Sequence, residues 1–160
     1  MFKIICTLML IAASCSLSAQ QLNPEQKAIQ SLIASTYDQA NSKVQTSPIV
    51  TVADYAIADW IQGEKGGRAL LKKTNGNWEI TMCGGQGLTV AKNLIEIGIP
   101  TAQAHELANA LKAAETQLDQ QKIKLFDSFG KTISLKEMQG NHHADRANKN
   151  EKTEKHPHHP

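Results

Sequence analysis

The sequence predicts an α+β domain in which an antiparallel β-meander is packed by N-terminal and C-terminal helices. Three observations support this fold class: helical spacing of apolar residues after Pro24, short apolar runs separated by turn residues over residues 49–83, and a return to helical spacing over residues 91–118. We expect the helices to cover one face of the sheet.

Residues 1–19 have the pattern of a secretory signal peptide. Lys3 supplies the positive start, residues 4–13 are mostly apolar, and small residues follow as far as Ala19. Cleavage after Ala19 would free a chain in the periplasm or outside the cell; the alternative is a lipoprotein with its lipid anchor at Cys15. The apolar run is shorter than the roughly 20 residues that span a bilayer, so we expect no transmembrane segment in the mature chain.

A helix followed by four strands is expected next. Asn23 is a suitable N-cap and Pro24 a suitable first residue for a helix that runs to about Ala40. An Asn75-Gly76 pair provides the positive backbone angles of a two-residue hairpin. The predicted strands cover residues 49–52, 55–61, 68–73 and 78–83, with residues 63–67 as a break, and four charged residues are expected on a solvated face: Asp59, Lys72, Lys73 and Glu79.

The second half of the domain is expected to begin with two helices. One starts near Ala91 and is ended by Gly98, and a longer one is capped by Thr101 and reaches Leu118. The weak pattern over residues 123–129 and 133–135 indicates a last pair of short strands. We therefore place a single domain over residues 20–139, followed by a disordered histidine-rich tail over residues 140–160, where no apolar periodicity survives.

The charge and the cysteines narrow the function classes. Residues 20–135 contain 11 basic and 11 acidic side chains, so no basic face is available for nucleic acid. After removal of the signal peptide, Cys83 is the only thiol, because Cys15 either leaves with the signal peptide or is lipidated. The mature domain therefore has no internal disulfide and depends on its apolar core.

The tail contains the strongest candidate ligands. Five of the six histidines lie in the last 19 residues, and the intervening prolines keep their neighbours extended. Neutral imidazole binds copper and zinc, and several imidazoles on a flexible segment can close around one ion. The predicted metal ligands are His142, His143, His156, His158 and His159.

A second set of candidate ligands lies at the end of the fourth predicted strand. Cys83 and Met82 offer thiolate and thioether sulfur, which suit cuprous copper. Adjacent strand residues point to opposite faces, so the two can bind one ion only if the strand ends between them. Both residue types are also common in ordinary cores. A further alternative is a cysteine-dependent enzyme with His105 as the base, although no local motif supports catalysis.

Several sequence blocks carry a resemblance to a known family. They are residues 53–60 (ADYAIADW), 66–71 (GGRALL) and 78–85 (WEITMCGG), together with the alanine-rich helix from Thr101 and the histidine-rich tail. This combination resembles the copper uptake system-associated proteins, a family of small exported bacterial proteins, over most of the mature chain. The helix and meander also resemble cystatin-like and nuclear-transport-factor-like folds, whose shape alone implies no function.

The resemblance implies a periplasmic accessory protein that works with components of a copper transport system. Because no local motif supports catalysis, we do not expect an enzyme. Together with the tail, the resemblance leads us to expect an accessory protein for copper uptake that binds copper or zinc. The alternative is a metal-independent interaction module whose sheet face contacts a membrane transporter.

Overall fold

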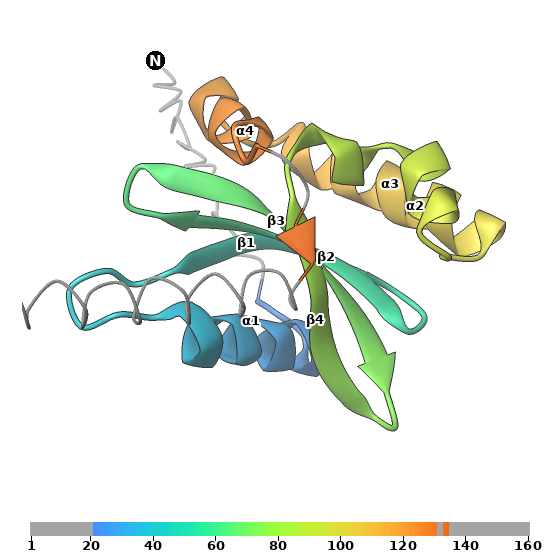
Figure 1. Cartoon of the computed structure of the whole chain (residues 1–160), viewed down its shortest axis with the longest axis horizontal. Helices are drawn as coiled ribbons and strands as arrows, with labels where there is room; N and C mark the ends of the chain where they lie inside the picture. Colours follow the sequence, from blue (N-terminus) through green and yellow to red (C-terminus); the bar gives the residue numbers. More distant parts are fainter. Residues whose placement is uncertain (1–20, 131–132, 135–160) are drawn as a thin grey trace, which may run out of the picture.

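The computed structural model describes residues 21–130 and 133–134, and within them it has the predicted α+β architecture (Figure 1). The strands form one antiparallel sheet in the order β1-β2-β3-β4-β5. The elements are α1 (Pro24–Tyr37), β1 (Gln45–Val52), β2 (Tyr55–Gln62), β3 (Lys65–Thr74), β4 (Asn77–Gly84), the short 3₁₀ turn η1 (Gln86–Thr89), α2 (Ala91–Glu96), α3 (Thr101–Glu115), α4 (Gln120–Asp127) and β5 (Ile133–Ser134).

Helix α1 begins as its sequence predicts. The Asn23 side chain accepts a hydrogen bond from the backbone N–H of Gln26, and the Gln26 side chain accepts one from the N–H of Asn23, which together form a capping box. The helix ends at Tyr37 and not near Ala40. Asp38 follows, and its carboxylate accepts the N–H of Val44, which turns the chain toward β1.

The meander forms with tight turns at the expected places. Ala53 takes a φ of 50° between β1 and β2, while Asn75 and Gly76 take φ values of 51° and 82° between β3 and β4. The turn between β2 and β3 differs from the predicted break over residues 63–67, because β3 begins at Lys65 and includes Gly66 and Gly67. These glycines belong to the strand and do not interrupt it.

Helices cover both faces of the sheet, so the expectation of a single covered face is wrong (Figure 1). On one face, α1 packs its Ile29 and Ile33 against small and apolar strand residues: Ile49, Ala56, Ala58, Ala69, Leu71, Ile80 and Cys83. On the other face, α2 and α3 pack against Val52, Ile57 and Leu70. The physical reason is that the strands are apolar on both faces, which requires two covering layers.

Helices α2 and α3 form a continuous layer. Gly98, at a φ of 96°, ends the first helix. Thr101 is the first residue of α3 and does not cap it, because Pro100 occupies the N-cap position without a side-chain hydrogen bond. The helix stops at Glu115, before Leu118, and buries four residues on the face toward the sheet: Ala104, Leu107, Ala108 and Leu111.

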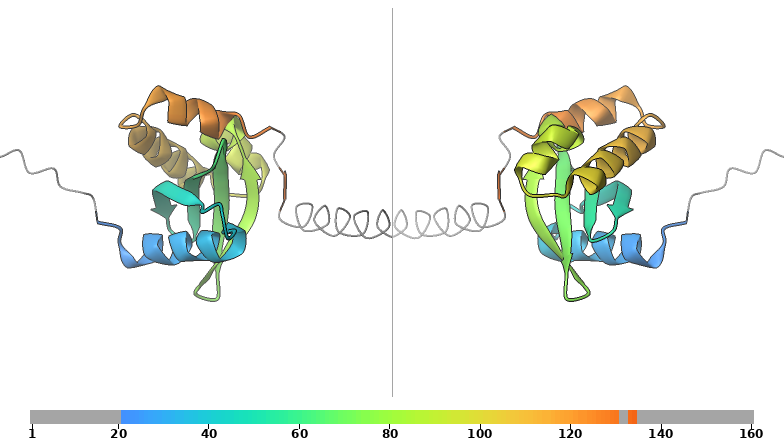
Figure 2. Two further views of the ribbon diagram at one scale, coloured as in Figure 1. Left: turned by 90° about the vertical axis from the view of Figure 1, so that its left-hand side faces the viewer. Right: turned by 90° about the vertical axis from the view of Figure 1, so that its right-hand side faces the viewer.

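The segment after α3 differs most from the prediction. Residues 120–127 form the helix α4 in place of a strand, with the Asp119 carboxylate accepting the N–H of Gln121 at its start. Phe126 is fully buried on this helix. The strand β5 does pair with β4, so only the second half of the predicted pair is confirmed. Side views show α4 crossing the end of the sheet (Figure 2).

Candidate functional site

The predicted metal ligands do not come together in the described part of the chain. The five tail histidines lie outside residues 21–130 and 133–134. Strand β4 continues through Gly84, so it does not end between the two sulfur residues. Cys83 faces the α1 side of the sheet, whereas Met82 packs on the α2–α3 side. The two sulfur atoms therefore point to opposite faces and cannot share one ion in this arrangement.

Cys83 is a free and buried thiol, with 1% of its surface exposed. Burial raises its pKa to about 11, against a smaller opposing effect from Tyr37. The Tyr37 hydroxyl is buried beside it, and burial likewise raises the pKa of Tyr37. At neutral pH the thiol is therefore protonated, which disfavours both nucleophilic attack and metal ligation.

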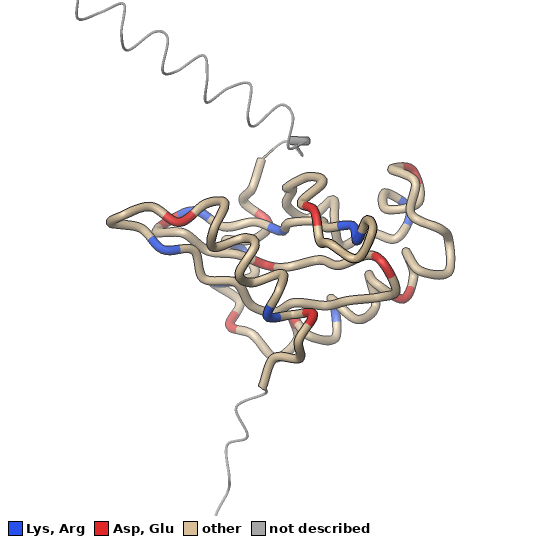
Figure 3. Tube along the Cα trace, turned by 90° about the horizontal axis from the view of Figure 1, so that it is seen from below, with Lys and Arg blue, Asp and Glu red and all other residues tan. Residues whose placement is uncertain are grey.

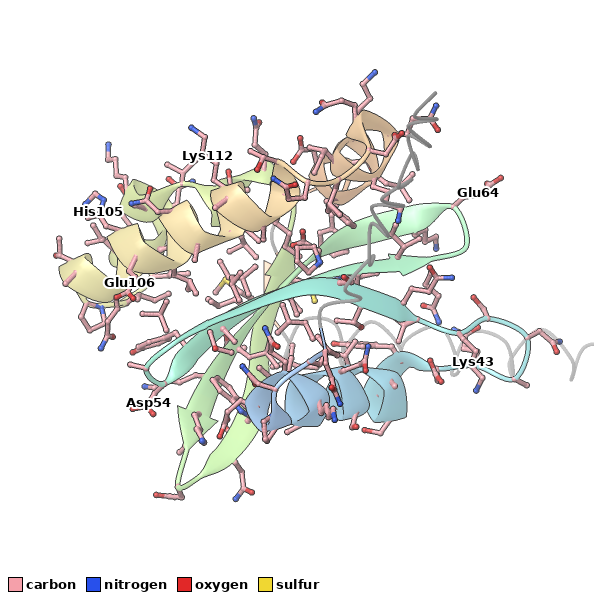
Figure 4. All side chains as sticks on the ribbon, turned by 180° about the vertical axis from the view of Figure 1, so that it is seen from behind. Lys43, Asp54, Glu64, His105, Glu106 and Lys112 are labelled. Carbon is pink, nitrogen blue, oxygen red and sulfur yellow. The ribbon has the colours of Figure 1, made fainter. Side chains whose placement is uncertain are left out.

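His105 does not form a catalytic pair with Cys83. It is exposed on α3, which packs on the opposite face of the sheet from the thiol. The side-chain view shows His105 and Lys112 on the side of α3 away from the sheet (Figure 4). His105 lies outside the buried stripe of α3, which runs through Ala104 and Leu107.

A cluster of four charged residues, of which Arg68 and Asp59 are buried, lies where α3 and α4 meet the sheet. It consists of Arg68 on β3, Asp59 on β2, Glu115 at the end of α3 and Asp127 at the end of α4. Asp59 was expected on a solvated face, but its exposed fraction is 0%. The expectation fails because α3 and α4 cover this face of the meander.

Arg68 holds the cluster together through directed bonds. Its Nε donates to Glu115 Oε1 at 2.7 Å, and its terminal nitrogen donates to Asp127 Oδ1 at 2.8 Å. The guanidinium carbon also lies 5.6 Å from the centre of the Phe126 ring. Burial disfavours the charge on Arg68, but the bonds to Glu115 and Asp127 outweigh that effect and raise its pKa.

Unlike the carboxyl groups of Glu115 and Asp127, that of Asp59 does not accept a hydrogen bond from Arg68. Its Oδ1 lies 3.7 Å from Arg68 Nε, and neither oxygen has a hydrogen-bond partner among the described residues. Burial, together with the negative charge of Glu115, raises the pKa of Asp59 to about 8 despite the nearby guanidinium. The side chain therefore favours its neutral form in the folded protein.

Three glycines allow α4 and the residues after it to approach the sheet. A Cβ atom on Gly66 would lie 3.1 Å from the backbone of Leu125, and one on Gly67 would lie 2.9 Å from the ring of Phe129. A Cβ on Gly85 would lie 2.5 Å from the carbonyl oxygen of Phe129. Because glycine leaves this space free, Asp127 can reach Arg68.

Among the described residues, no group of three or more His, Cys, Asp or Glu side chains has an arrangement that could hold a metal ion. The three carboxyl groups of the cluster surround a guanidinium, which occupies the central position. On the rest of the described chain, acidic and basic residues are interspersed along the trace (Figure 3). The described helices include none of the length and apolarity needed to cross a membrane.

Comparison with models of protein families, with curated proteins and with solved structures finds no match to this chain.

Proposed function

We propose that this chain is an exported accessory protein of copper uptake, which binds cupric copper or zinc through the histidines of its C-terminal tail. The observation that carries the proposal is the concentration of five of the six histidines in the last 19 residues. Imidazole is the commonest protein ligand for these metals, and a flexible segment can present several rings to one ion. The resemblance of the sequence blocks to copper uptake system-associated proteins points to the same role and to a partner in copper transport.

The geometry of the described residues favours the tail over Met82 and Cys83 as the principal site. A thiol with a pKa of about 11 gives little thiolate at neutral pH. Met82 lies on the other face of the sheet and cannot supply a second ligand to the same ion. Cuprous copper at Cys83 would require opening of the α1 layer.

Isothermal titration with copper and with zinc tests the proposal. The mature chain should bind, and a chain shortened after Gln139 should not. This boundary keeps β5, which pairs with Met82 and Cys83, so the second candidate site is left unchanged. Equal affinity of the two chains would show that the tail is not the site.

Point variants distinguish loss of the histidine ligands from other effects of deleting the tail. Replacing the five tail histidines with Gln should abolish binding, whereas His105→Gln, the matched control at an exposed helix position, should leave it unchanged. Free histidine titrates near pH 6.5 and only the neutral ring coordinates, so affinity should weaken steeply between about pH 7 and pH 5. Binding that persists in the variant without tail histidines but is lost in Cys83→Ser would transfer the site to the thiol.

A further inference from the structure

The charge cluster around Arg68 contains one carboxyl group, that of Asp59, to which the guanidinium makes no hydrogen bond. Nε of Arg68 has a single hydrogen, and it is directed to Glu115 at 2.7 Å. The separation of 3.7 Å between Nε and Asp59 Oδ1 is too long for a hydrogen bond. The Arg68–Asp127 bond uses another donor at 2.8 Å. Asp59 is thus fully buried and oriented into the cluster, yet both of its oxygens lack a partner.

A proton on Asp59 resolves this imbalance. An ionised carboxylate that is buried without a donor has a high free-energy cost, whereas a neutral carboxyl group can donate one hydrogen bond to a neighbouring oxygen. Glu115 is the neighbouring carboxylate, held in place by Arg68. Two adjacent carboxyl groups with one shared proton are a stable combination in proteins, because both cannot easily be charged at once.

We propose that the folded chain holds one proton between Asp59 and Glu115, and that loss of this proton loosens α4 and the end of α3 from the sheet. The corner would then act as a pH-sensitive latch, independent of the metal-binding tail. The groups facing Asp59 are Arg68 from β3, Glu115 from α3 and Asp127 from α4. Strand β1, which pairs with β2 on its other side, contains no titratable residue.

The direction of the pH effect follows from the raised pKa. Asp59 titrates near pH 4 in the unfolded chain and near pH 8 in the fold. The folded state therefore holds a proton that the unfolded state has released between these values. The stability contributed by the neutral group is fully present below about pH 4 and is lost as the pH rises through about 8. The unfolding constant should rise by up to about tenfold per pH unit within this window.

Carbon-13 NMR of the side-chain carboxyl groups in the full chain measures the proton directly. The Asp59 signal should have the chemical shift of a neutral acid at pH 6 and should move to that of a carboxylate near pH 8. The signal of the exposed Asp54 is followed in the same spectra for comparison. An Asp59 signal that is already ionised at pH 6 would overturn the proposal without the need for any variant.

Urea unfolding between pH 5 and pH 9 tests the link to stability. Asp59→Asn mimics the neutral acid, so it should fold and should lose the part of the pH dependence that the wild type shows between pH 5 and pH 8. Asp54→Asn is the matched control and should retain the wild-type dependence. Parallel curves for the wild type and Asp59→Asn would contradict the linkage.

Limited trypsin digestion tests whether the loosening is local to the latch. Cleavage after Lys122 and Lys124 in α4 should increase between pH 7 and pH 8.5 more in the wild type than in Asp59→Asn, by several-fold. The variant also corrects for the pH dependence of the protease. An equal increase in both proteins would show that the proton does not control α4.

Discussion

At the scale of single residues, Arg68 organises the corner where α3 and α4 meet the sheet. Its side chain is 1% exposed. It donates to carboxylates at the ends of α3 and α4, two helices that lie far from β3 in the sequence. A planar guanidinium suits this position because its N–H donors point in fixed directions. Removal of its charge would leave the buried Asp59 and its partly exposed partner Glu115 without a cation, which costs much more than the loss of an exposed ion pair.

Arg68→Met should therefore destabilise the protein strongly. Methionine keeps most of the volume but removes the charge, so we expect a loss of about 3–5 kcal/mol at pH 7. Urea unfolding measures this change. Lys72→Met, an exposed position on the same strand, is the control and should change stability by less than about 0.5 kcal/mol. A loss for Arg68→Met as small as that of the control would show that the guanidinium does not hold the corner together.

Cys83 should react slowly with thiol reagents in the folded protein. Its thiol is buried and burial raises its pKa to about 11, so both access and thiolate formation are restricted. Labelling at pH 8 should be slow without denaturant and fast in urea. An unfolded cysteine titrates near pH 8.5, so the neutral thiol stabilises the fold below that pH, and this contribution is lost as the pH rises toward 11. Rapid labelling of the native chain would contradict the burial.

The sequence drew attention to Cys83, which is a free thiol in the structure, but it did not reveal the partners of Asp59. Alternation along β2 puts Asp59 on the same face of the sheet as Ile57. We nevertheless expected the Asp59 side chain to be exposed to solvent, because nothing in the neighbouring sequence indicates that helices cover this face of the sheet. The signal that could have corrected this lies in the neighbouring strand: Arg68, between glycines and apolar residues, pairs directly with Asp59 in the β2–β3 register.

At the scale of elements, α4 shows why local pattern was insufficient. Apolar residues at 123, 125 and 129 resemble the alternation of a strand, but Asp119 provides a helix cap and Phe126 supplies the buried anchor. The β3–β4 hairpin, by contrast, was predictable because Asn75-Gly76 determines its geometry from two adjacent residues. Local turn chemistry is visible in a sequence, whereas the close approach of distant segments is not.

Gly85→Ala should disturb the contact between α4 and the sheet. The new methyl group would lie 2.5 Å from the Phe129 carbonyl oxygen and 2.8 Å from that of Asp127, so the backbone must move. We expect a loss of about 1–3 kcal/mol, measured by urea unfolding. Gly130→Ala is the matched control, because no atom lies within 4 Å of its added Cβ. Equal stability of both variants would mean that α4 does not depend on this close approach.

At the scale of the whole molecule, the sheet lies between two helical layers, and its two apolar faces account for this arrangement. Ala56 and Ala58 let α1 approach one face, while Ile57 and Leu70 contact the layer of α2 and α3 on the other. Both sets of residues can be read from the sequence, but the strand pattern does not predict which helices pack against each face of the sheet. The metal ligands of the tail stay a prediction from composition alone, and they lie outside the described residues.

The effect of metal on thermal unfolding should distinguish a tail site from a site in the domain. A ligand stabilises a protein only in so far as it binds the folded state better than the unfolded state. From its composition we expect the tail to be equally available to copper in both states, so a saturating concentration should leave the unfolding midpoint of the full chain nearly unchanged. A site at Cys83 would depend on the fold, and a copper concentration 100 times its dissociation constant would add about 2.7 kcal/mol. Calorimetric scans with and without copper or zinc make this comparison, with the chain shortened after Gln139 as the control. A large rise in the midpoint of both chains would place the metal within the domain and would contradict the tail as the principal site.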